Sequence, residues 1–253
     1  MKTPSLLALE IVAHRGSSYL APENTTIACA LAWEEKADAV ELDVHLTKDG
    51  RLVVIHDGNT KRTTGVAGEV AQMTLAEIQA LDARRWKKAQ HAGVTIPTLD
   101  EFLAVGPDWR RFFIEVKCGA EAVSELKRCL ERARFTPEQA VIISFNQDVV
   151  AAAKRDIPEY QAAWLVGAAK DSAKGRSLTL DEVIAEARGI AADGLDLSEA
   201  WPIDAAFVKK VNKAGLRLWV WTVDDPALAR RLKEAGVDGI TTNRPGWLRE
   251  QLL

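Results

Sequence analysis

One segment of the chain carries acidic side chains where a buried strand would carry apolar ones. Residues 39–45 read Ala-Val-Glu-Leu-Asp-Val-His, so Glu41 and Asp43 share one face of the expected strand and the residues between them are apolar. At this spacing the two residues lie about 7 Å apart along a strand. In an interior of low dielectric constant the two carboxylates repel each other unless a cation is present. The pattern therefore indicates a cation site.

A second segment repeats the reversed pattern. In Phe-Ile-Glu-Val-Lys (113–117), Glu115 and Lys117 share one face. Acids from two neighbouring strands would form an oxygen-rich site suited to Mg²⁺ or Ca²⁺. An internal Glu–Lys ion pair without a metal is the structural alternative. The two segments together favour the metal site.

Two of the four histidines end expected strands. His14 follows the first strand, and counting back from a turn at 48–51 places His56 roughly opposite Asp43. A neighbouring carboxylate raises an imidazole pKa from its reference of about 6.5, whereas a metal lowers it. Two rings in unequal surroundings can therefore act as one base and one acid near neutral pH. The other two histidines, His45 and His91, are interpreted as structural or surface residues.

Two cationic side chains are expected beside these groups. Arg15 offers a bidentate fork to a phosphate, and Lys117 acts as a point charge. A divalent cation, two fixed positive charges and two imidazoles together describe a site for an anionic ester. Phosphoryl chemistry is the reaction class that such a site favours.

The elements that must position these residues alternate between strands and helices. Expected strands lie at 11–14, 39–45, 112–117, 141–145, 161–166, 194–197, 217–223 and 239–242, each followed by a helical segment. Strands separated by helices form a parallel sheet. Eight such units in 253 residues predict an α/β fold, a single-domain (β/α)8 or TIM barrel, which uses about 250 residues and places its active site at the carboxyl ends of the strands.

One apolar segment does not fit the alternation. Residues 52–56 follow the strand at 39–45 too closely for a parallel crossover, so we expect an antiparallel hairpin strand. Lys48-Asp49-Gly50-Arg51 supplies the turn. Residues 57–97 are polar, and we expect them to form a small insertion over the barrel mouth with one helical stretch at 74–86.

Composition excludes several classes of protein. With 33 Lys and Arg against 36 Asp and Glu, the net charge of −3 differs from the basic character of nucleic-acid binders. No apolar run approaches the ~18 residues of a membrane span. Glu10 interrupts the apolar residues 6–9, so no signal-peptide core is expected. The odd count of three cysteines favours a reducing cytoplasm.

An ordered set of motifs runs from residue 12 to residue 245 and covers nearly the whole chain. The motifs are His14-Arg15-Gly16, Pro22-Glu23-Asn24-Thr25, Glu41-Leu42-Asp43-Val44, His56-Asp57, Glu115-Val116-Lys117, Ser144-Phe145, Trp221-Thr222-Val223 and Asp238-Gly239-Ile240-Thr241-Thr242-Asn243. In this set the chain resembles the glycerophosphodiester phosphodiesterase family. Each motif is weak alone, whereas the ordered set is specific.

The resemblance implies a hydrolase that uses Mg²⁺ or Ca²⁺. Its substrates would be small glycerophosphodiesters such as glycerophosphocholine or glycerophosphoethanolamine, and its products glycerol 3-phosphate and an alcohol. It implies metal ligands at Glu41, Asp43 and Glu115, an acid/base pair at His14 and His56, phosphate binding by Arg15 and Lys117, a substrate pocket lined by Trp221, and bracing of the first loop by Glu23 and Asn24. Asn243 stands where the family usually has Asp, which affects the geometry of that loop.

The order of events is left open at this point. Either water attacks the phosphorus directly, or the glycerol 2-hydroxyl attacks first and water opens the resulting cyclic phosphate. We favour His14 as the base and His56 as the acid, with the reverse as the alternative.

Two other functions compete with this one. A lysophospholipase D or sphingomyelinase D would share the histidines and acids but act on lipids. The polar Lys61-Arg62-Thr63-Thr64-Gly65 in the insertion favours small diesters instead. A non-catalytic phosphate-binding barrel is the remote alternative, and it predicts the loss of a ligand or a histidine, which the sequence does not show.

Overall fold

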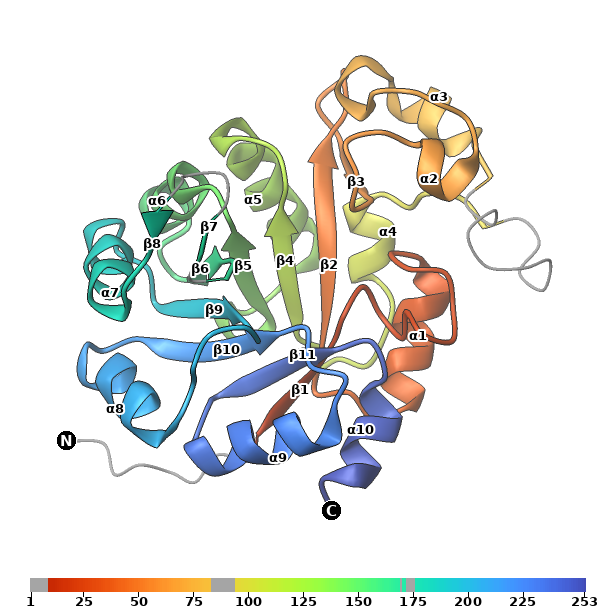
Figure 1. The fold of residues 1–253 in the computed structure, drawn as a ribbon. Coiled ribbons are helices and arrows are strands. Elements are labelled where there is room, and N and C mark those ends of the chain that lie inside the picture. The colour runs from red at the N-terminus through yellow and green to blue at the C-terminus, as the bar shows by residue number, and fades with distance from the viewer. Residues whose placement is uncertain (1–8, 83–93, 169, 172–175) are drawn as a thin grey trace.

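Eight parallel strands close into a barrel in the computed structural model, which describes residues 9–82, 94–168, 170–171 and 176–253 (Figure 1). The barrel strands are β1 (Glu10–Ala13), β2 (Ala39–Leu46), β4 (Phe112–Val116), β5 (Ala140–Ser144), β6 (Gln161–Val166), β9 (Gly194–Ser198), β10 (Arg217–Trp221) and β11 (Gly239–Thr242). They pair in this order, and β1 closes the ring by pairing with both β2 and β11. The predicted TIM barrel is confirmed.

A helix follows each barrel strand and covers the outside of the sheet (Figure 1). These helices are α1 (Thr26–Glu34), α4 (Leu99–Leu103), α5 (Val123–Ala133), α6 (Gln147–Asp156), α7 (Leu180–Gly189), α8 (Ala205–Lys213), α9 (Pro226–Ala235) and α10 (Pro245–Gln251), with short 3₁₀ turns at Ala120–Ala122 and Pro137–Gln139. Thr98 and Thr179 begin α4 and α7, and each exchanges hydrogen bonds with a Glu three residues later. Such capping boxes satisfy backbone N–H groups that the first helical turn leaves open.

The lower part of the barrel interior is filled by apolar side chains around Trp219, which is fully buried. The others in this cluster are Val12, Ala39, Phe113, Val141, Ile143, Ala163 and Leu165. Gly194 and Gly239 on the two strands beside β10 make room for the indole, because a Cβ at either position would lie 2.6 Å or 2.8 Å from it. The interior is therefore packed up to the level of Trp219.

The hairpin strand β3 (Leu52–Val54) pairs antiparallel with β2, as predicted, although it ends two residues earlier than expected. The predicted register is wrong by one residue, because the Ile55 N–H donates to Asp43 O at 3.0 Å and His56 comes one position later. The cause is the turn. Thr47 N donates to Arg51 O, which leaves a three-residue loop that ends at Gly50 with φ 75, whereas the prediction assumed four residues.

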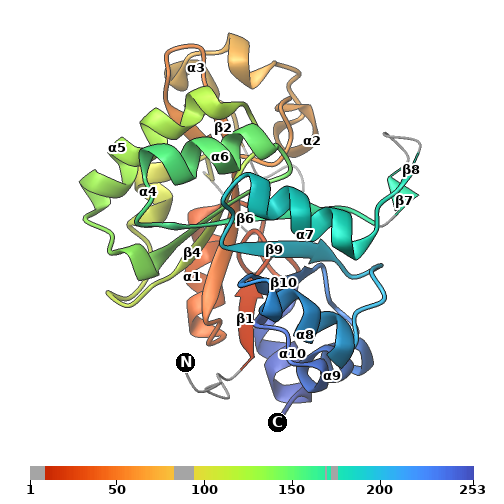
Figure 2. The same cartoon turned by 90° about the vertical axis from the view of Figure 1, so that its left-hand side faces the viewer.

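The insertion after β3 lies at the carboxyl end of β2 (Figure 1) and contains α2 (Lys61–Thr64), a 3₁₀ turn at Val70–Gln72 and α3 (Leu75–Gln79). The predicted helix at 74–86 is thus confirmed only over its first part. His91, residues 6–8 and residues 83–86 lie outside the described residues. A small hairpin of β7 (Lys170–Asp171) and β8 (Arg176–Ser177) projects beside α7 (Figure 2). None of the helices described is long and apolar enough to cross a bilayer.

The packing around Trp219 predicts a strong effect of one methyl group. Gly194→Ala would place a Cβ 2.6 Å from the indole and 3.0 Å from the Arg217 backbone oxygen, so we expect a loss of about 1–3 kcal/mol in the free energy of unfolding. Urea denaturation measures this loss. Gly167→Ala is the matched control, since nothing lies within 4 Å of its Cβ position. Equal stability of the two variants would contradict the packing argument.

Candidate active site

The turn after β1 is the tightest part of the site. Arg15 and Gly16 both adopt left-handed backbone, with φ 55 and 80. A Cβ at Gly16 would lie 2.5 Å from the backbone of Ala28 in α1, so only glycine allows this close approach. The turn aims the Arg15 N–H at Glu41 Oε2, at 2.8 Å. The His-Arg-Gly motif therefore serves to connect the end of β1 to β2.

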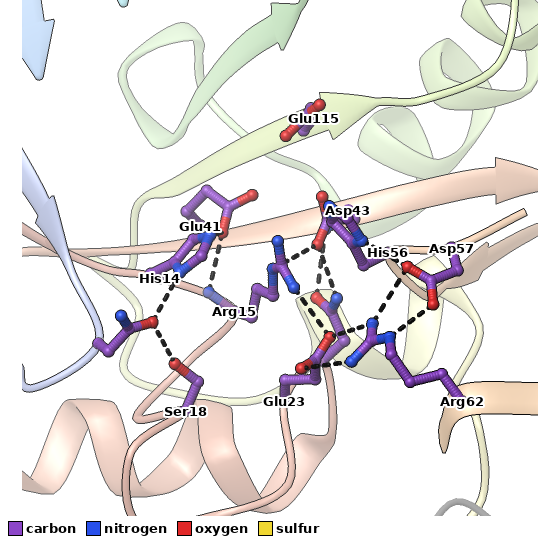
Figure 3. Close-up of polar contacts among 12 residues, drawn as sticks. His14, Arg15, Ser18, Glu23, Glu41, Asp43, His56, Asp57, Arg62 and Glu115 are labelled. Carbon is purple, nitrogen blue, oxygen red and sulfur yellow. Dashed lines mark hydrogen bonds and ion pairs between the residues drawn. The ribbon is translucent and has the colours of Figure 1, made fainter. Parts of the chain in front are cut away.

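The three predicted metal ligands come together at the carboxyl ends of β2 and β4 (Figure 3). Asp43 and Glu115 are register partners on the two strands, and Glu41 lies one inward position below Asp43. One oxygen from each carboxylate lies within 4.8 Å of the others. All three residues are buried. The group is referred to below as the acidic triad.

Asp43 receives most of the compensating contacts. Arg15 Nε lies 3.1 Å from Asp43 Oδ2, and Asn24 Nδ2 donates to the same oxygen at 2.8 Å. Burial opposes ionisation, but the charges of Arg15 and Lys117 and the Asn24 hydrogen bond lower the pKa of Asp43 below its ordinary value. Asp43 is therefore the ionised member of the acidic triad.

The other two members of the acidic triad, Glu41 and Glu115, have raised pKa values. Burial, followed by repulsion from Asp43 and Glu115, raises the pKa of Glu41 well above its ordinary value. Burial and Asp43 raise the pKa of Glu115 to about 7, against the ion pair that Lys117 Nζ forms with it at 2.8 Å. Without a further positive charge the acidic triad is incompletely ionised at neutral pH.

The acidic triad fits a divalent cation. Asp43 Oδ1 is buried and accepts no hydrogen bond from any described residue, and Lys117 Nζ lies 3.6 Å away. Among the described residues, the lysine and arginine side chains within ion-pair distance of the three carboxylates are Arg15 and Lys117, so one negative charge stays uncompensated when all three are ionised. Carboxylate oxygens are the ligands that Mg²⁺ and Ca²⁺ prefer. The Glu–Lys ion pair considered as an alternative is present as well, between Lys117 Nζ and Glu115 Oε1 at 2.8 Å.

His14 is held by an amide. Asn243 Nδ2 donates to Asp224 Oδ2 at 2.6 Å, which turns Asn243 Oδ1 toward His14 Nδ1 at 2.7 Å. Because this oxygen can only accept, His14 carries its proton on Nδ1 and leaves the Nε2 lone pair free. Nε2 lies 4.0 Å from Glu41 Oε2. Burial, followed by the charge of Arg15, lowers the pKa of His14 to about 4, so the ring is neutral at pH 7.

His56 is held by a carboxylate. Its Nδ1 lies 2.7 Å from Asp57 Oδ1, and Arg62 of α2 donates to both oxygens of Asp57. Burial opposes ionisation of Asp57, but the hydrogen bonds from Arg62 and His56 lower its pKa to about 2. The two imidazoles thus have unequal partners, one neutral and one negatively charged.

The Pro-Glu-Asn-Thr loop braces this arrangement more directly than the sequence predicts. Arg62 also donates to both oxygens of Glu23, which accepts from Arg15 NH1 at 3.0 Å (Figure 3). Asn24, with φ 58, accepts from the Asp43 N–H as well as donating to its side chain. Glu23 and Asn24 therefore support Arg15 and Asp43 rather than the loop alone.

His45 has the structural place expected of it. Its Nε2 lies 3.1 Å from the backbone oxygen of His56. Burial lowers the pKa of the His45 ring. The contact secures the end of the hairpin from which His56 projects.

A cavity of about 290 Å³ opens beside the acidic triad. Its lining consists of His14, Arg15, Glu41, His56, Glu115, Lys117, Ile143, Phe145, Leu165, Asp196, Trp221, Thr222 and Thr241. Trp221 packs edge to face against Phe145 with ring centroids 5.5 Å apart, and Lys117 Nζ lies 5.8 Å from the Phe145 ring. The cavity thus joins a polar wall to an aromatic one, and every predicted catalytic or phosphate-binding residue borders it.

Sequence reasoning missed several residues of the site. Arg62, Asp224 and the orienting role of Asn243 gave no local signal, since their partners are distant in sequence. Asp196 did give one. Gly-Leu-Asp-Leu-Ser in β9 places Asp196 inward between two apolar residues, the same reversal that identified Glu41. Burial, followed by Glu115, raises the pKa of Asp196 well above its ordinary value.

A second cluster of possible metal ligands is already occupied by arginines. Asp100, Glu125 and Cys129 lie close enough to share an ion. However, Arg132 donates to both acids and Arg128 donates to Glu125. Guanidinium groups thus neutralise these carboxylates, and the cluster stabilises the contact between α4 and α5.

Comparison with known proteins gives a consistent result. The Glycerophosphoryl diester phosphodiesterase family matches residues 14–247. A glycerophosphodiester phosphodiesterase of Bacillus subtilis is 34% identical over 250 residues, covering 92% of this chain and 83% of the relative. One from Caldanaerobacter subterraneus is 36% identical over 239 residues, covering 93% and 94%.

Solved structures agree with these sequences. An Oleispira antarctica phosphodiesterase in complex with the product sn-glycerol-3-phosphate is 29% identical, with a TM-score of 0.85 and 96% coverage of both chains. A glycerophosphodiester phosphodiesterase from Agrobacterium tumefaciens is 28% identical, with a TM-score of 0.79 and coverage of 96% and 99%. Since the matched region contains both histidines and the whole acidic triad, the chain belongs to the glycerophosphoryl diester phosphodiesterase family and is an enzyme of that activity.

Proposed function

We propose that the protein hydrolyses small glycerophosphodiesters, such as glycerophosphocholine or glycerophosphoethanolamine, to glycerol 3-phosphate and an alcohol in a reaction that depends on Mg²⁺ or Ca²⁺. The observation that carries this proposal is the acidic triad, with its ligand oxygens within 4.8 Å of one another, in a cavity that both His14 and His56 border. The product named in the Oleispira complex supports the substrate class.

His14 is the general base in this proposal. Its Nδ1 proton is engaged by Asn243 and its Nε2 is free, so the ring can take a proton only on the side away from Asn243. A neutral ring at pH 7, which follows from a pKa of about 4, is ready to accept the proton of the attacking hydroxyl.

His56 is the general acid. Asp57 on Nδ1 orients the ring, so that Nε2 is the atom that would donate a proton to the leaving oxygen. An alkoxide is a poor leaving group without this proton. Arg62 keeps Asp57 ionised and in place, so it acts through Asp57 as a positioning residue.

Arg15 and Lys117 bind the phosphate. Both border the cavity, and their contacts with the acidic triad fix the positions of the two charges before substrate arrives. Glu41, Asp43 and Glu115 would hold the divalent cation. A bound cation would supply positive charge that offsets the carboxylates and the phosphate and makes a nearby hydroxyl more acidic.

The cavity volume supports small substrates. About 290 Å³ lies just below the ~300–1,000 Å³ found for the pockets of drug-sized ligands, which suits a small glycerophosphodiester. The direct test is release of glycerol 3-phosphate from glycerophosphoethanolamine, with and without EDTA. Faster turnover of a lysolipid than of glycerophosphocholine would favour the phospholipase D alternative. Trapping a cyclic glycerophosphate in a single turnover would identify the glycerol 2-hydroxyl as the nucleophile.

The two histidine roles predict different responses to the leaving group. His14→Ala and His56→Ala should each lower kcat for glycerophosphocholine by about 10²–10⁴-fold. When 4-nitrophenol replaces choline as the leaving group, its anion leaves without protonation. This substrate should restore the kcat of the His56→Ala variant, whereas the kcat of His14→Ala should stay low. Steady-state kinetics with both substrates measures the difference. Rescue of His14→Ala instead would exchange the two roles, and rescue of neither would refute paired acid/base catalysis.

The acidic triad predicts that metal affinity falls at low pH. Because the pKa of Glu115 is raised to about 7 without metal, this side chain becomes protonated as the pH falls from 8 to 6. A metal ion must displace that proton to bind, so the affinity for Mg²⁺ or Ca²⁺ should weaken over this range. Calorimetry at pH 7 in buffers of different ionisation enthalpy would detect the released proton. Glu115→Gln should weaken binding, and Glu125→Gln in the arginine-filled cluster is the control that should not. Equal affinity at both pH values would contradict the assignment.

The amide that holds His14 predicts a positioning effect. Asn243→Ala removes the acceptor of the Nδ1 proton, so kcat should fall with KM nearly unchanged, by less than the about 10²–10⁴-fold expected for His14→Ala. Ser18→Ala is the control, because Ser18 Oγ donates to the same Asn243 oxygen at 2.9 Å but takes no part in the proton transfer proposed for His14. An Asn243→Ala variant that keeps the kcat of Ser18→Ala would show that His14 needs no such support.

A further inference from the structure

Asp196 lies on the wall of the cavity opposite the metal ligands of β2. In the closed ring of eight strands, β9 is four strands from β2 in either direction. Asp196 borders the cavity together with Glu41 and Glu115, and its side chain is 1% exposed. The barrel thus carries an acid on each side of the space that the substrate would enter.

One oxygen of the Asp196 carboxyl group lacks a hydrogen-bond donor in the part of the chain that the structure describes. Its Oδ1 is buried, and among residues 9–82, 94–168, 170–171 and 176–253 no hydrogen-bond donor reaches it. Leu165, its register partner on β6, is apolar. Trp221 Nε1 donates to the backbone oxygen of Asp196, at 3.0 Å, and not to its side chain. Buried polar atoms are paired in most structures, and an unpaired one calls for an explanation.

An ion does not provide that explanation. The residues that can share a cation at this end of the barrel are Glu41, Asp43 and Glu115, and Asp196 does not belong to the group. A structural role would pair the carboxyl group with a backbone N–H, an arginine or a lysine, as it does for Asp57 and Asp224. What is missing at Asp196 is therefore a donor that arrives from the cavity.

We propose that Asp196 binds the terminal hydroxyl of the glycerol moiety and so selects substrates that carry it. This inference rests on the proposed function. With the phosphate between His14 and His56, the terminal hydroxyl is the substrate donor farthest from the phosphorus, and Asp196 is the acid farthest around the barrel from β2. A hydroxyl can donate to the carboxyl oxygen whether or not the group is ionised.

Selection follows from the burial of Asp196. A substrate that lacks the terminal hydroxyl would leave the buried Oδ1 without a donor, and sites built around a substrate hydroxyl discriminate strongly against such analogues. We expect the analogue to bind about 10–100-fold more weakly, the ratio that one unmade buried hydrogen bond produces.

Binding of product analogues tests this inference without turnover. Calorimetry would compare glycerol 3-phosphate with propane-1,2-diol 1-phosphate, which lacks the terminal hydroxyl, and with propane-1,3-diol phosphate, which lacks the 2-hydroxyl. The wild-type protein should bind propane-1,2-diol 1-phosphate about 10–100-fold more weakly than glycerol 3-phosphate. In Asp196→Ala this ratio should approach one, whereas the cost of losing the 2-hydroxyl should stay unchanged.

Two further variants control the comparison. Asp196→Asn keeps an acceptor and should retain the ratio. Glu199→Gln removes an exposed acid just beyond the end of β9 and should behave as the wild type. The inference would be overturned if Asp196→Ala bound all three ligands more weakly by the same factor. It would also be overturned if the wild-type protein bound glycerol 3-phosphate and propane-1,2-diol 1-phosphate with equal affinity. A failure of the proposed function would appear separately, as the absence of glycerol 3-phosphate release by the wild type.

Discussion

Burial of three carboxylates within one small volume is the constraint on which the rest of the site depends. Their repulsion must be offset, and the offset comes from chain segments that end at the same face of the barrel. Arg15 adopts left-handed backbone beside them, and Lys117 follows the strand that carries Glu115. A parallel barrel brings all of these segments to one mouth, which explains why residues far apart in sequence can share one charge balance.

At the same face of the barrel the two imidazoles have hydrogen-bond partners of different charge. Asn243 presents a neutral oxygen to His14, while Asp57 presents a carboxylate to His56. The family usually has Asp at the position of Asn243, and this difference therefore has a physical consequence. A second carboxylate beside His14 would favour the charged ring, the opposite of what the proposed general base requires, and it would also repel Asp224, which now accepts from the Asn243 amide.

Much of the fold and the acidic triad followed from strand periodicity. Apolar residues must face the helices outside a parallel barrel, so the acids at 41, 43 and 115 could only point inward. The hairpin register could not be read in this way, because three-residue and four-residue turns both fit Lys48-Asp49-Gly50-Arg51 and only the left-handed Gly50 decides between them. Arg62 could not be found either, since its contacts with Glu23 and Asp57 depend on how the insertion folds back.

The depth of the cavity follows from the residues that face inward along each strand. On β9 the period of two places Gly194 and Asp196 on the inward face, and on β10 it places Trp219 and Trp221 there, with Trp219 as the register partner of Asp196. The indole of Trp219 fits inside the barrel because Gly194 and Gly239 lack side chains. The cavity therefore lies beyond the indole of Trp219: Trp221 lines it and Trp219 does not. Packing below the site and chemistry within it thus arise from the same alternation along each strand.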